Sequence, residues 1–479
     1  MSATNKPPVI VWFRQDLRLS DNPALCAAAA TGQAVLPVYV LDDVSPGRWR
    51  QGSASRWWLH RSLTALDKSL DHGLCVLNGN AVELIPMLAA ETGATAIFWN
   101  RCYEPWNVAS DEQIRSTLVE DGCSVETFNG SLIAEPWSAL KADGTPYRVF
   151  TPFFRAGYQG PKEPTAAPRR APEISNVVHS GLSVGIDGLA LLPQVEWYRS
   201  LEAHWAPGED GAEQRLERFL ADGIRGYARL RDRPDLLHVS RLSPHLHFGE
   251  LSPHQVWHRA RSAPPGVEDD ANAFLRELAW REFSYYLLFH NPALPETNLQ
   301  SKFDRFPWMK SREMLAAWQQ GMTGIPFVDA GMRELWHTGF MHNRVRMLAG
   351  SFLVKNLLHD WRQGAAWFWD TLVDADLANN SASWQWVAGC GADAAPYFRI
   401  FNPVTQGRKF DPDGAYVRRF VPELTSLPDK FIHAPWECPQ SELQSAGVRL
   451  GEDYPRPIVD LAESRRRALE SFRQLKADH

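Results

Sequence analysis

The chain has 479 residues, of which 44% are apolar, and it carries a formal net charge of −6. Its length predicts two to three domains, and its apolar content excludes a disordered chain. The acidic balance excludes a uniformly basic DNA-binding surface, so a DNA-binding function would require a local basic patch.

The six cysteines show no CxxC or CxxH spacing. Their scatter argues against a metal site and against a disulfide framework, and it is typical of a cytosolic protein. The first apolar run, Val9–Phe13, is too short for a signal peptide, and no stretch is long enough to span a membrane. We therefore expect a cytoplasmic protein without a metal site.

The first 135 residues alternate short apolar runs with segments of helical periodicity, Ser53–His72 and Asn80–Thr92. The apolar runs predict buried strands at Val9–Phe13, Ala34–Leu41, Leu74–Leu77, Ala96–Trp99 and Ser124–Phe128. This alternation predicts an α/β domain over residues 1–135, built on a doubly wound parallel sheet with a ligand crevice at the carboxyl ends of its strands. No GxGxxG follows the first strand, which disfavours a dinucleotide dehydrogenase.

Residues 136–205 are rich in Pro, Gly, Ser and Ala, as in Gly160–Pro164, and predict a surface linker between two domains. Strand signals nearly vanish from about Glu209 onward, so we expect a large all-α domain over residues 206–479. Its longer helices are predicted at Ala212–Leu220, Ser252–Ala263, Ala271–Phe289, Ser311–Gln319, Ala330–His337, His342–Leu358, Ala365–Leu372 and Ile458–Lys476.

The segment Asp374–Trp386 is dense in polar groups, whereas its neighbours are apolar. Carboxylates can accept hydrogen bonds from ribose hydroxyls or ring N–H groups, and an Asn amide can both donate and accept. The pattern favours a ligand site, and a solvated loop capped by Asp and Asn is the alternative.

Five sequence motifs resemble signatures of the photolyase/cryptochrome family. They lie at Val11–Asn22, Ser240–Pro244, Glu277–Phe283, Met341–Met347 and, for the flavin-binding signature, from Asp374 through Pro396–Pro403 to Gln406–Asp411. The resemblance covers the chain from Val9 to about Trp436. It implies an α/β domain, a linker and an all-α C-terminal FAD-binding domain, which agrees with the fold predicted from the pattern of apolar residues.

The resemblance implies that FAD binds in the helical domain. Its phosphate-contacting residues would be Tyr227, Ser240, Leu242 and Ser243, and hydroxyls with free N–H groups at a helix start suit a pyrophosphate. Many relatives place Thr where this chain has Val239, so one hydroxyl contact is lost here. The remaining implied flavin-site residues are Trp280, Arg281, Asn343, Arg346, Asp374, Asp376 and Asn380. An ion pair of Arg346 with Asp374 would keep that acid ionised.

By the same resemblance, Asn380 would face the flavin N5. Photolyases usually have Asn at this position, whereas plant cryptochromes have Asp and insect cryptochromes have Cys. An Asn has no ionisable proton to give, which favours a fully reduced flavin anion that can donate an electron.

The residues expected beside the bound lesion favour a cyclobutane dimer over a (6-4) lesion as the substrate. Photolyases that act on (6-4) lesions carry two His near the flavin for proton transfer, and the matching residues here are Asn343 and Met347. Glu277 would hydrogen-bond the dimer, and Trp280 and Trp386 would form the flat walls of a slot for the extruded lesion, with Met347 beside them.

A basic patch would bind the UV-damaged DNA through its phosphates. Its members would be Arg225, Arg229, Arg231 and Arg233, together with Arg344 and with Arg408 and Lys409. The alternative is a solvated helix surface with ordinary ion pairs.

Trp384, Trp361 and Trp308 match the family's three-tryptophan electron relay. Trp361 and Trp384 would be about 34 Å apart on one straight helix. Since that is too far for one electron hop, the relay requires the chain to fold back between them.

A second, light-harvesting chromophore is implied by the family, with the loop Asn100–Asn107 as its binding segment. Asn107 matches a folate-contacting Asn in one subgroup, but Val108 stands where that subgroup has Glu. The resemblance favours 5,10-methenyltetrahydrofolate, with a deazaflavin or FMN as alternatives.

The expected function is light-driven repair of cyclobutane pyrimidine dimers by a monomeric, cytoplasmic lyase that needs no obligate protein partner. One alternative is a cryptochrome-type blue-light receptor, for which we would expect a long disordered tail beyond the helix that contains Arg465–Arg467. The others are a (6-4) photolyase, for which the His pair is missing, and a different α/β nucleotide-binding enzyme, which would be colourless when pure.

Overall fold

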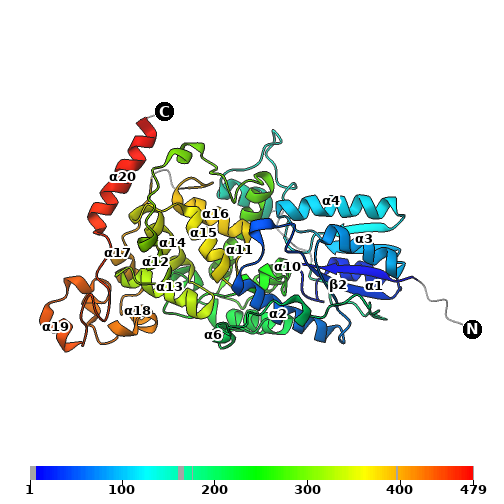
Figure 1. Cartoon of the computed structure of the whole chain (residues 1–479), viewed down its shortest axis with the longest axis horizontal. Helices are drawn as coiled ribbons and strands as arrows, with labels where there is room; N and C mark the ends of the chain where they lie inside the picture. The colour runs from blue at the N-terminus through cyan, green and yellow to red at the C-terminus, as the bar shows by residue number, and fades with distance from the viewer. Residues whose placement is uncertain (1–6, 160–166, 175, 395–397, 478–479) are drawn as a thin grey trace, which may run out of the picture. The chain divides into compact units, whose positions relative to one another are not determined.

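The computed structural model describes residues 7–159, 167–174, 176–394 and 398–477. The chain forms two compact units, the first made of Met1–Arg225 with Ser240–Pro292 and the second of Gly226–Val239 with Ala293–His479 (Figure 1). The predicted boundaries at residues 135 and 205 stay predictions, and the Gly160–Pro164 stretch lies outside the described residues.

The first unit is built on a parallel sheet of five strands in the order β3-β2-β1-β4-β5. The strands are β1 (Val9–Phe13), β2 (Val35–Leu41), β3 (Cys75–Asn78), β4 (Ala96–Asn100) and β5 (Ser124–Phe128). Every residue of β1 and β2 is buried, as expected for strands that are covered on both sides. The predicted α/β fold is confirmed, with each strand placed to within one residue. The expected burial of Ser124–Phe128 is wrong, because β5 lies at the edge of the sheet and none of its residues is buried.

Helices alternate with these strands. They are α1 (Pro23–Ala30), α2 (Ser53–Ser69), α3 (Ala81–Thr92) and α4 (Pro105–Glu120), and α3 packs beside α4 (Figure 1). The sequence-based prediction lacks α1 and α4. Both begin with Pro at the first helical position, and the side chain of Asn22 caps α1 by accepting a hydrogen bond from Leu25 N at 3.1 Å. The capping pattern could have identified α1.

The remainder of the first unit is helical. Its helices are α5 (Phe150–Tyr158), α6 (Arg199–Glu202), α7 (Glu209–Arg218) with a π-helical turn at Phe219–Gly223, α9 (Ser243–His247), α10 (Pro253–Arg261) and α11 (Glu268–His290). Helix α5 lies inside the predicted linker, yet its residues Phe150, Phe153, Phe154 and Tyr158 are buried and α5 packs against α11. This part of the stretch 136–205 is therefore packed core, because its aromatic side chains outweigh the surrounding Pro and Gly.

The second unit is an all-α structure, as predicted. Its helices are α8 (Tyr227–Leu230), α12 (Arg312–Gln319), α13 (Pro326–Thr338), α14 (Asn343–Ser351) with a π-helical turn at Phe352–Asn356, α15 (Trp361–Thr371), α16 (Leu377–Ala388), α17 (Pro403–Phe410), α18 (Ala415–Phe420), α19 (Gln440–Ser445) and α20 (Leu461–Ala477). Its described residues contain no strand beyond an isolated bridge between Leu450 and Tyr454.

Two glycines let helices α14 and α15 approach the indole ring of Trp384 on α16. A Cβ atom at Gly364, in the first turn of α15, would lie 2.1 Å from Trp384 Cη2. A Cβ atom at Gly350 on α14 would lie 3.3 Å from Val387 Cγ1 and 3.5 Å from Trp384 Cζ3. Since the start of α15 lies against the end of α16, the chain folds back between Trp361 and Trp384, as a relay requires.

We expect Gly364→Ala to lower the free energy of unfolding by about 1–3 kcal/mol relative to Gly350→Ala. Both substitutions give the same gain in helix propensity, and both add a methyl group beside the Trp384 ring. Only the methyl group at position 364 forces that ring to move. Urea denaturation of the two variants measures the difference, and equal midpoints would contradict the tight contact at Gly364.

Candidate functional site

A partly buried ion pair joins α14 to the segment before α16 in the second unit. The Nη2 atom of Arg346 donates to both carboxylate oxygens of Asp374, at 3.0 and 2.8 Å, and its Nε donates to the carbonyl oxygen of Met341 at 2.6 Å. Asp374 is buried, so its charge requires such a partner. The predicted pair is therefore present.

The first turn of α16 carries two of the predicted flavin-site residues. Asp376 is the N-cap, and its Oδ1 accepts hydrogen bonds from Asn379 N at 2.8 Å and Asn379 Nδ2 at 2.7 Å. Asn380 Nδ2 donates to the carbonyl oxygen of Ala365 on α15 at 3.0 Å. This hydrogen bond fixes the orientation of the Asn380 amide. It leaves Oδ1 as the atom that can accept a hydrogen bond from a ligand.

These residues fit a flavin nucleotide. A paired buried acid, a capping acid and an oriented amide acceptor are gathered on α14, α16 and the segment between α15 and α16. Ribose hydroxyls and a ring N–H group require acceptors of this kind. All four side chains were expected from the sequence, but the Ala365 carbonyl was not, because a backbone contact leaves no mark in the residue pattern.

The first turn of α14 holds the residues expected on the lesion side. Asn343 is exposed and its Nδ2 lies 4.0 Å from Met347 Sδ, so the two residues share one side of the helix. Arg344 Nη2 donates to Asp232 Oδ2 at 2.6 Å, and its guanidinium lies 4.5 Å from the Phe410 ring centre. Arg344 is thus engaged by an acid that the sequence analysis did not consider.

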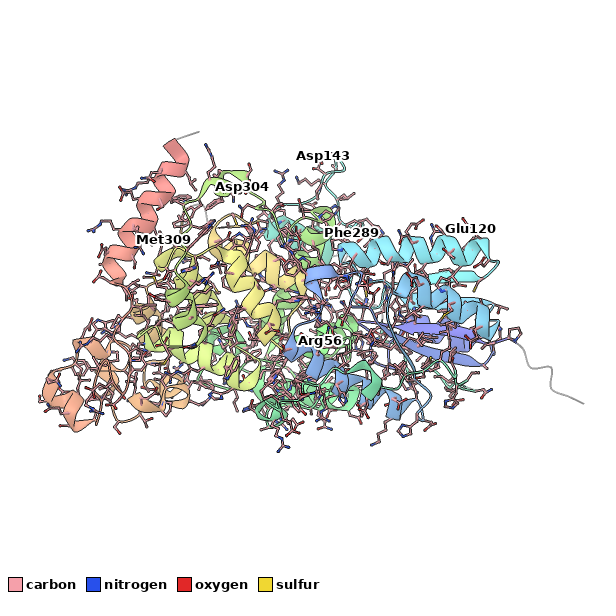
Figure 2. The ribbon with its side chains drawn as sticks, in the orientation of Figure 1. Arg56, Glu120, Asp143, Phe289, Asp304 and Met309 are labelled. Carbon is pink, nitrogen blue, oxygen red and sulfur yellow. The ribbon has the colours of Figure 1, made fainter. Side chains whose placement is uncertain are left out.

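The three tryptophans of the predicted relay belong to one apolar core. Trp361 and Trp384 are buried, whereas Trp308 is partly exposed and precedes Met309, which lies at the surface (Figure 2). Trp361 Nε1 donates to Asn298 Oδ1 at 2.9 Å. Trp384 and Trp361 are thus both buried and exposure rises only at Trp308, so a positive charge would become better solvated on reaching Trp308. The relay itself stays a prediction.

Two further rings surround Trp384. Trp318 lies 6.2 Å from it and Phe368 lies 5.0 Å from it, both edge to face. Neither residue could be predicted from the sequence, because neither has a distinctive spacing from Trp384.

In the first unit, α11 carries Glu277, Trp280 and Arg281. The Trp280 ring stacks on Phe150 of α5 with ring centres 3.7 Å apart and planes 8° apart. Arg281 donates to the Ser131 carbonyl oxygen at 2.9 Å and to Glu282 Oε1 at 3.1 Å. In the second unit, Trp386 Nε1 donates to the Asp393 carbonyl oxygen at 3.1 Å. These bonds restrict the orientation of the Arg281 and Trp386 side chains.

The predicted phosphate-contacting stretch has a constrained backbone. Arg241 has a left-handed conformation with φ 54°, and Leu242 N donates to Ser240 Oγ at 3.4 Å just before Ser243 opens α9. Tyr227 opens α8 and lies 5.9 Å from the Arg231 guanidinium. The phosphate contacts of these residues stay predictions.

Three members of the predicted basic patch form ion pairs with acids. Arg233 pairs with Asp235 at 2.5 Å, Arg344 with Asp232, and Arg408 with Glu437 at 3.1 Å. For these three residues, the ion pairs agree with the alternative interpretation, a solvated helix surface with ordinary ion pairs. The DNA-binding role of the patch stays a prediction.

The loop predicted to hold a second chromophore follows β4, beside the carboxyl end of β1 at the point where strand order reverses. Its polar side chains contact one another. Glu104 accepts hydrogen bonds from Gln15 Nε2 at 2.6 Å and Asn107 Nδ2 at 2.9 Å, while Val108 is exposed. Asn107 therefore already uses its amide donor within the loop.

A buried lysine anchors the flavin-signature segment. Lys355 Nζ donates to the Arg399 carbonyl oxygen and lies 4.4 Å from the Phe398 ring centre. Pro396 and Tyr397, just before these residues, lie outside the described residues. The pKa of Lys355 is lowered from 10.5 to about 7, chiefly by burial, with Cys390 opposing the shift and Arg399 adding to it.

Lys355 makes stability depend on pH. The unfolded lysine keeps its proton to about pH 10.5, whereas the folded one releases it near pH 7, so stability rises with pH across this window. We expect Lys355→Met to remove a slope of at most about 1.4 kcal/mol per pH unit. Thermal unfolding at a series of pH values measures it, with Lys302→Met, another lysine over aromatic rings, as the control. Parallel curves for wild type and Lys355→Met would contradict this prediction.

No helix in the described part of the chain is both long enough and apolar enough to cross a membrane.

Two family models match the chain, one described as DNA photolyase over residues 9–171 and one as the FAD binding domain of DNA photolyase over residues 274–474. The deoxyribodipyrimidine photo-lyase of Agrobacterium fabrum is 48% identical, with 98% of each chain covered. Cryptochrome-1 of Arabidopsis thaliana is 38% identical over 97% of this chain and 70% of its own length.

Among solved structures, a bacterial class III photolyase from Agrobacterium tumefaciens superposes with a TM-score of 0.94 at 47% identity, covering 99% of each chain. Identity at this level over almost the full length of both chains establishes common ancestry as well as a common fold. The chain therefore belongs to the photolyase/cryptochrome family, and its C-terminal part is a photolyase FAD-binding domain.

Proposed function

We propose that the protein repairs cyclobutane pyrimidine dimers in DNA in a light-dependent reaction. The observation that carries this proposal is Asn380, whose amide is oriented by the Ala365 carbonyl so that Oδ1 is the acceptor. Bound FAD, in its fully reduced state, supplies the photoexcited electron that opens the cyclobutane ring and receives it back. Asn380, which the resemblance places opposite the flavin N5, has no ionisable proton to give and would favour the fully reduced state of bound FAD.

The residues of the chain hold and orient the reactants. Arg346 and Asp374 place a balanced pair of charges in the flavin site, and Asp376 fixes the start of α16. Tyr227, Ser240, Leu242, Ser243, Trp280, Arg281 and Asn343 are proposed as further FAD contacts. Trp384, Trp361 and Trp308 are proposed to return the flavin to its reduced state by passing electrons inward.

The two residues expected beside the lesion indicate the substrate class. Asn343 and Met347 share one side of α14, and neither can transfer a proton as a His would. Opening a cyclobutane ring requires an electron and its return without net proton transfer, so this pair suits that lesion. Glu277, Trp280 and Trp386 are proposed to contact the extruded dimer, and Arg231 and Arg344 its phosphates.

We further propose a methenyltetrahydrofolate antenna, in preference to a deazaflavin or FMN, and a monomeric enzyme of the cytoplasm. The absorption spectrum of the purified protein, followed by identification of the chromophores released on denaturation, tests both cofactors. Release of FAD together with a folate supports the proposal, and release of a deazaflavin or FMN in place of the folate contradicts the antenna assignment.

A repair assay tests the proposed reaction. Oligonucleotides with either a cyclobutane dimer or a (6-4) lesion are illuminated with the reduced protein. We expect restoration of the dimer substrate alone. A protein that restores neither substrate acts as a light receptor, and one that restores only the (6-4) substrate has a different lesion specificity.

A further inference from the structure

A pocket of about 460 Å³ lies in the first unit between helices α5, α10 and α11. Its floor is formed by the buried rings of Phe154, Tyr158 and Trp257, and its rim by Arg261, Asn272 and Arg276, which are exposed. We call these six residues the Arg276 pocket. None of the described residues that line it is among those assigned to the flavin or the lesion.

The rim of the Arg276 pocket is cationic. The Arg276 guanidinium lies 5.1 Å from the Phe150 ring centre and 5.5 Å from that of Phe154, and no carboxylate pairs with it among the described residues. Arg261 donates to Asn272 Oδ1 at 2.7 Å. None of the described lining residues is acidic. A guanidinium held over aromatic rings without a carboxylate is available to an external anion.

A column of stacked rings connects the pocket to Trp280. Trp280 stacks on Phe150 with planes 8° apart, Phe150 on Phe154 with planes 19° apart, and Phe154 on Tyr158 with planes 4° apart. Arg276 and Trp280 are also one turn apart on α11, a rise of about 6 Å. Packed rings therefore link the floor of the pocket to the ring that is proposed to contact the extruded dimer.

We propose that the Arg276 pocket binds the DNA strand next to the lesion. A backbone phosphate would lie on Arg261 and Arg276, and its nucleotide over the aromatic floor, because guanidinium groups beside aromatic rings are the usual platform for an unpaired strand. This proposal rests on the proposed function, since it takes Trp280 as a wall of the lesion slot. The cationic rim and the connection to Trp280 favour a DNA strand over a small chromophore.

Binding of the double variant Arg261→Gln/Arg276→Gln tests this proposal. Affinity for a single-stranded oligonucleotide with one central dimer is measured at several salt concentrations. We expect a loss of about tenfold or more and a shallower dependence of log affinity on log salt, by about one unit for each phosphate contact removed. Arg259→Gln is the matched control, because Arg259 is on α10 but outside the pocket and pairs with Glu213.

A second substrate, a dinucleotide that carries the dimer but no flanking phosphates, tests the proposed function independently of the Arg276 pocket. The double variant should repair this short substrate at the wild-type rate and keep its FAD content. Unchanged affinity and salt dependence on the long substrate would overturn the proposal, as would the loss of a small chromophore from the double variant with DNA binding intact. If wild-type protein fails to repair the short dimer, the proposed function fails instead.

Discussion

Replacing Trp384 with Phe should slow photoreduction of the oxidised flavin by more than about tenfold, which corresponds to about 1.4 kcal/mol of barrier. Trp384 is the buried end of the proposed relay, and its ring is fixed by contact with Gly364, Phe368 and Trp318. A phenyl ring is much harder to oxidise than an indole, so the first electron transfer is lost. Absorption of the oxidised flavin under illumination with an external reductant measures the rate.

The same variant, reduced chemically beforehand, should repair dimers at close to the wild-type rate, because the relay serves only to reduce the flavin. Trp318→Phe is the control, since Trp318 belongs to the same core and donates a buried hydrogen bond to the Ala349 carbonyl oxygen at 3.0 Å. It should retain photoreduction. If Trp384→Phe loses photoreduction and repair to the same extent, the ring has a structural role and the relay assignment is wrong.

Removing the Arg346 guanidinium should strongly lower both the FAD content and the stability of the protein, which is the second large effect that we expect. Arg346→Met removes the cation that pairs with the buried Asp374 carboxylate. Breaking a fully buried pair on one side costs about 3–5 kcal/mol, and the partial exposure of Arg346 reduces this cost. We expect protein that purifies with little FAD and unfolds at a lower denaturant concentration. The FAD-to-protein ratio and urea denaturation measure the two effects.

The double variant Arg346→Met/Asp374→Asn separates charge from shape. It removes both charges, so it should recover much of the lost stability, and the difference from the sum of the single changes gives the coupling between the two residues. FAD content should recover less, since the acceptor on Asp374 is altered. Additive effects of the two changes on stability would show that the pair contributes nothing beyond its separate members.

Most of the sheet could be predicted closely because strands such as β1 and β2 are apolar on both sides. The run Val9–Phe13 is fully buried in β1, and a run of that kind has few other stable placements. Helix α1 was missed because its alanine-rich sequence has no polar side to reveal a helical period. Helix α5 was missed because Pro and Gly dominate the composition around its aromatic residues.

The candidate site was predictable where its residues stand in motifs that resemble those of the family. The resemblance implied that Arg346 pairs with Asp374, and a buried acid is stabilised by such a cation. Contacts that depend on distant backbone were not predictable. The Ala365 carbonyl that orients Asn380, and the Asp232 carboxylate that binds Arg344, follow only from the packing of helices.

The most direct test of the proposed reaction is the fate of a cyclobutane dimer bound to fully reduced protein under light. Illumination should restore the two pyrimidines, while the same complex in the dark should leave the lesion intact. Tight, dimer-specific binding with the cyclobutane ring still closed after illumination would contradict it.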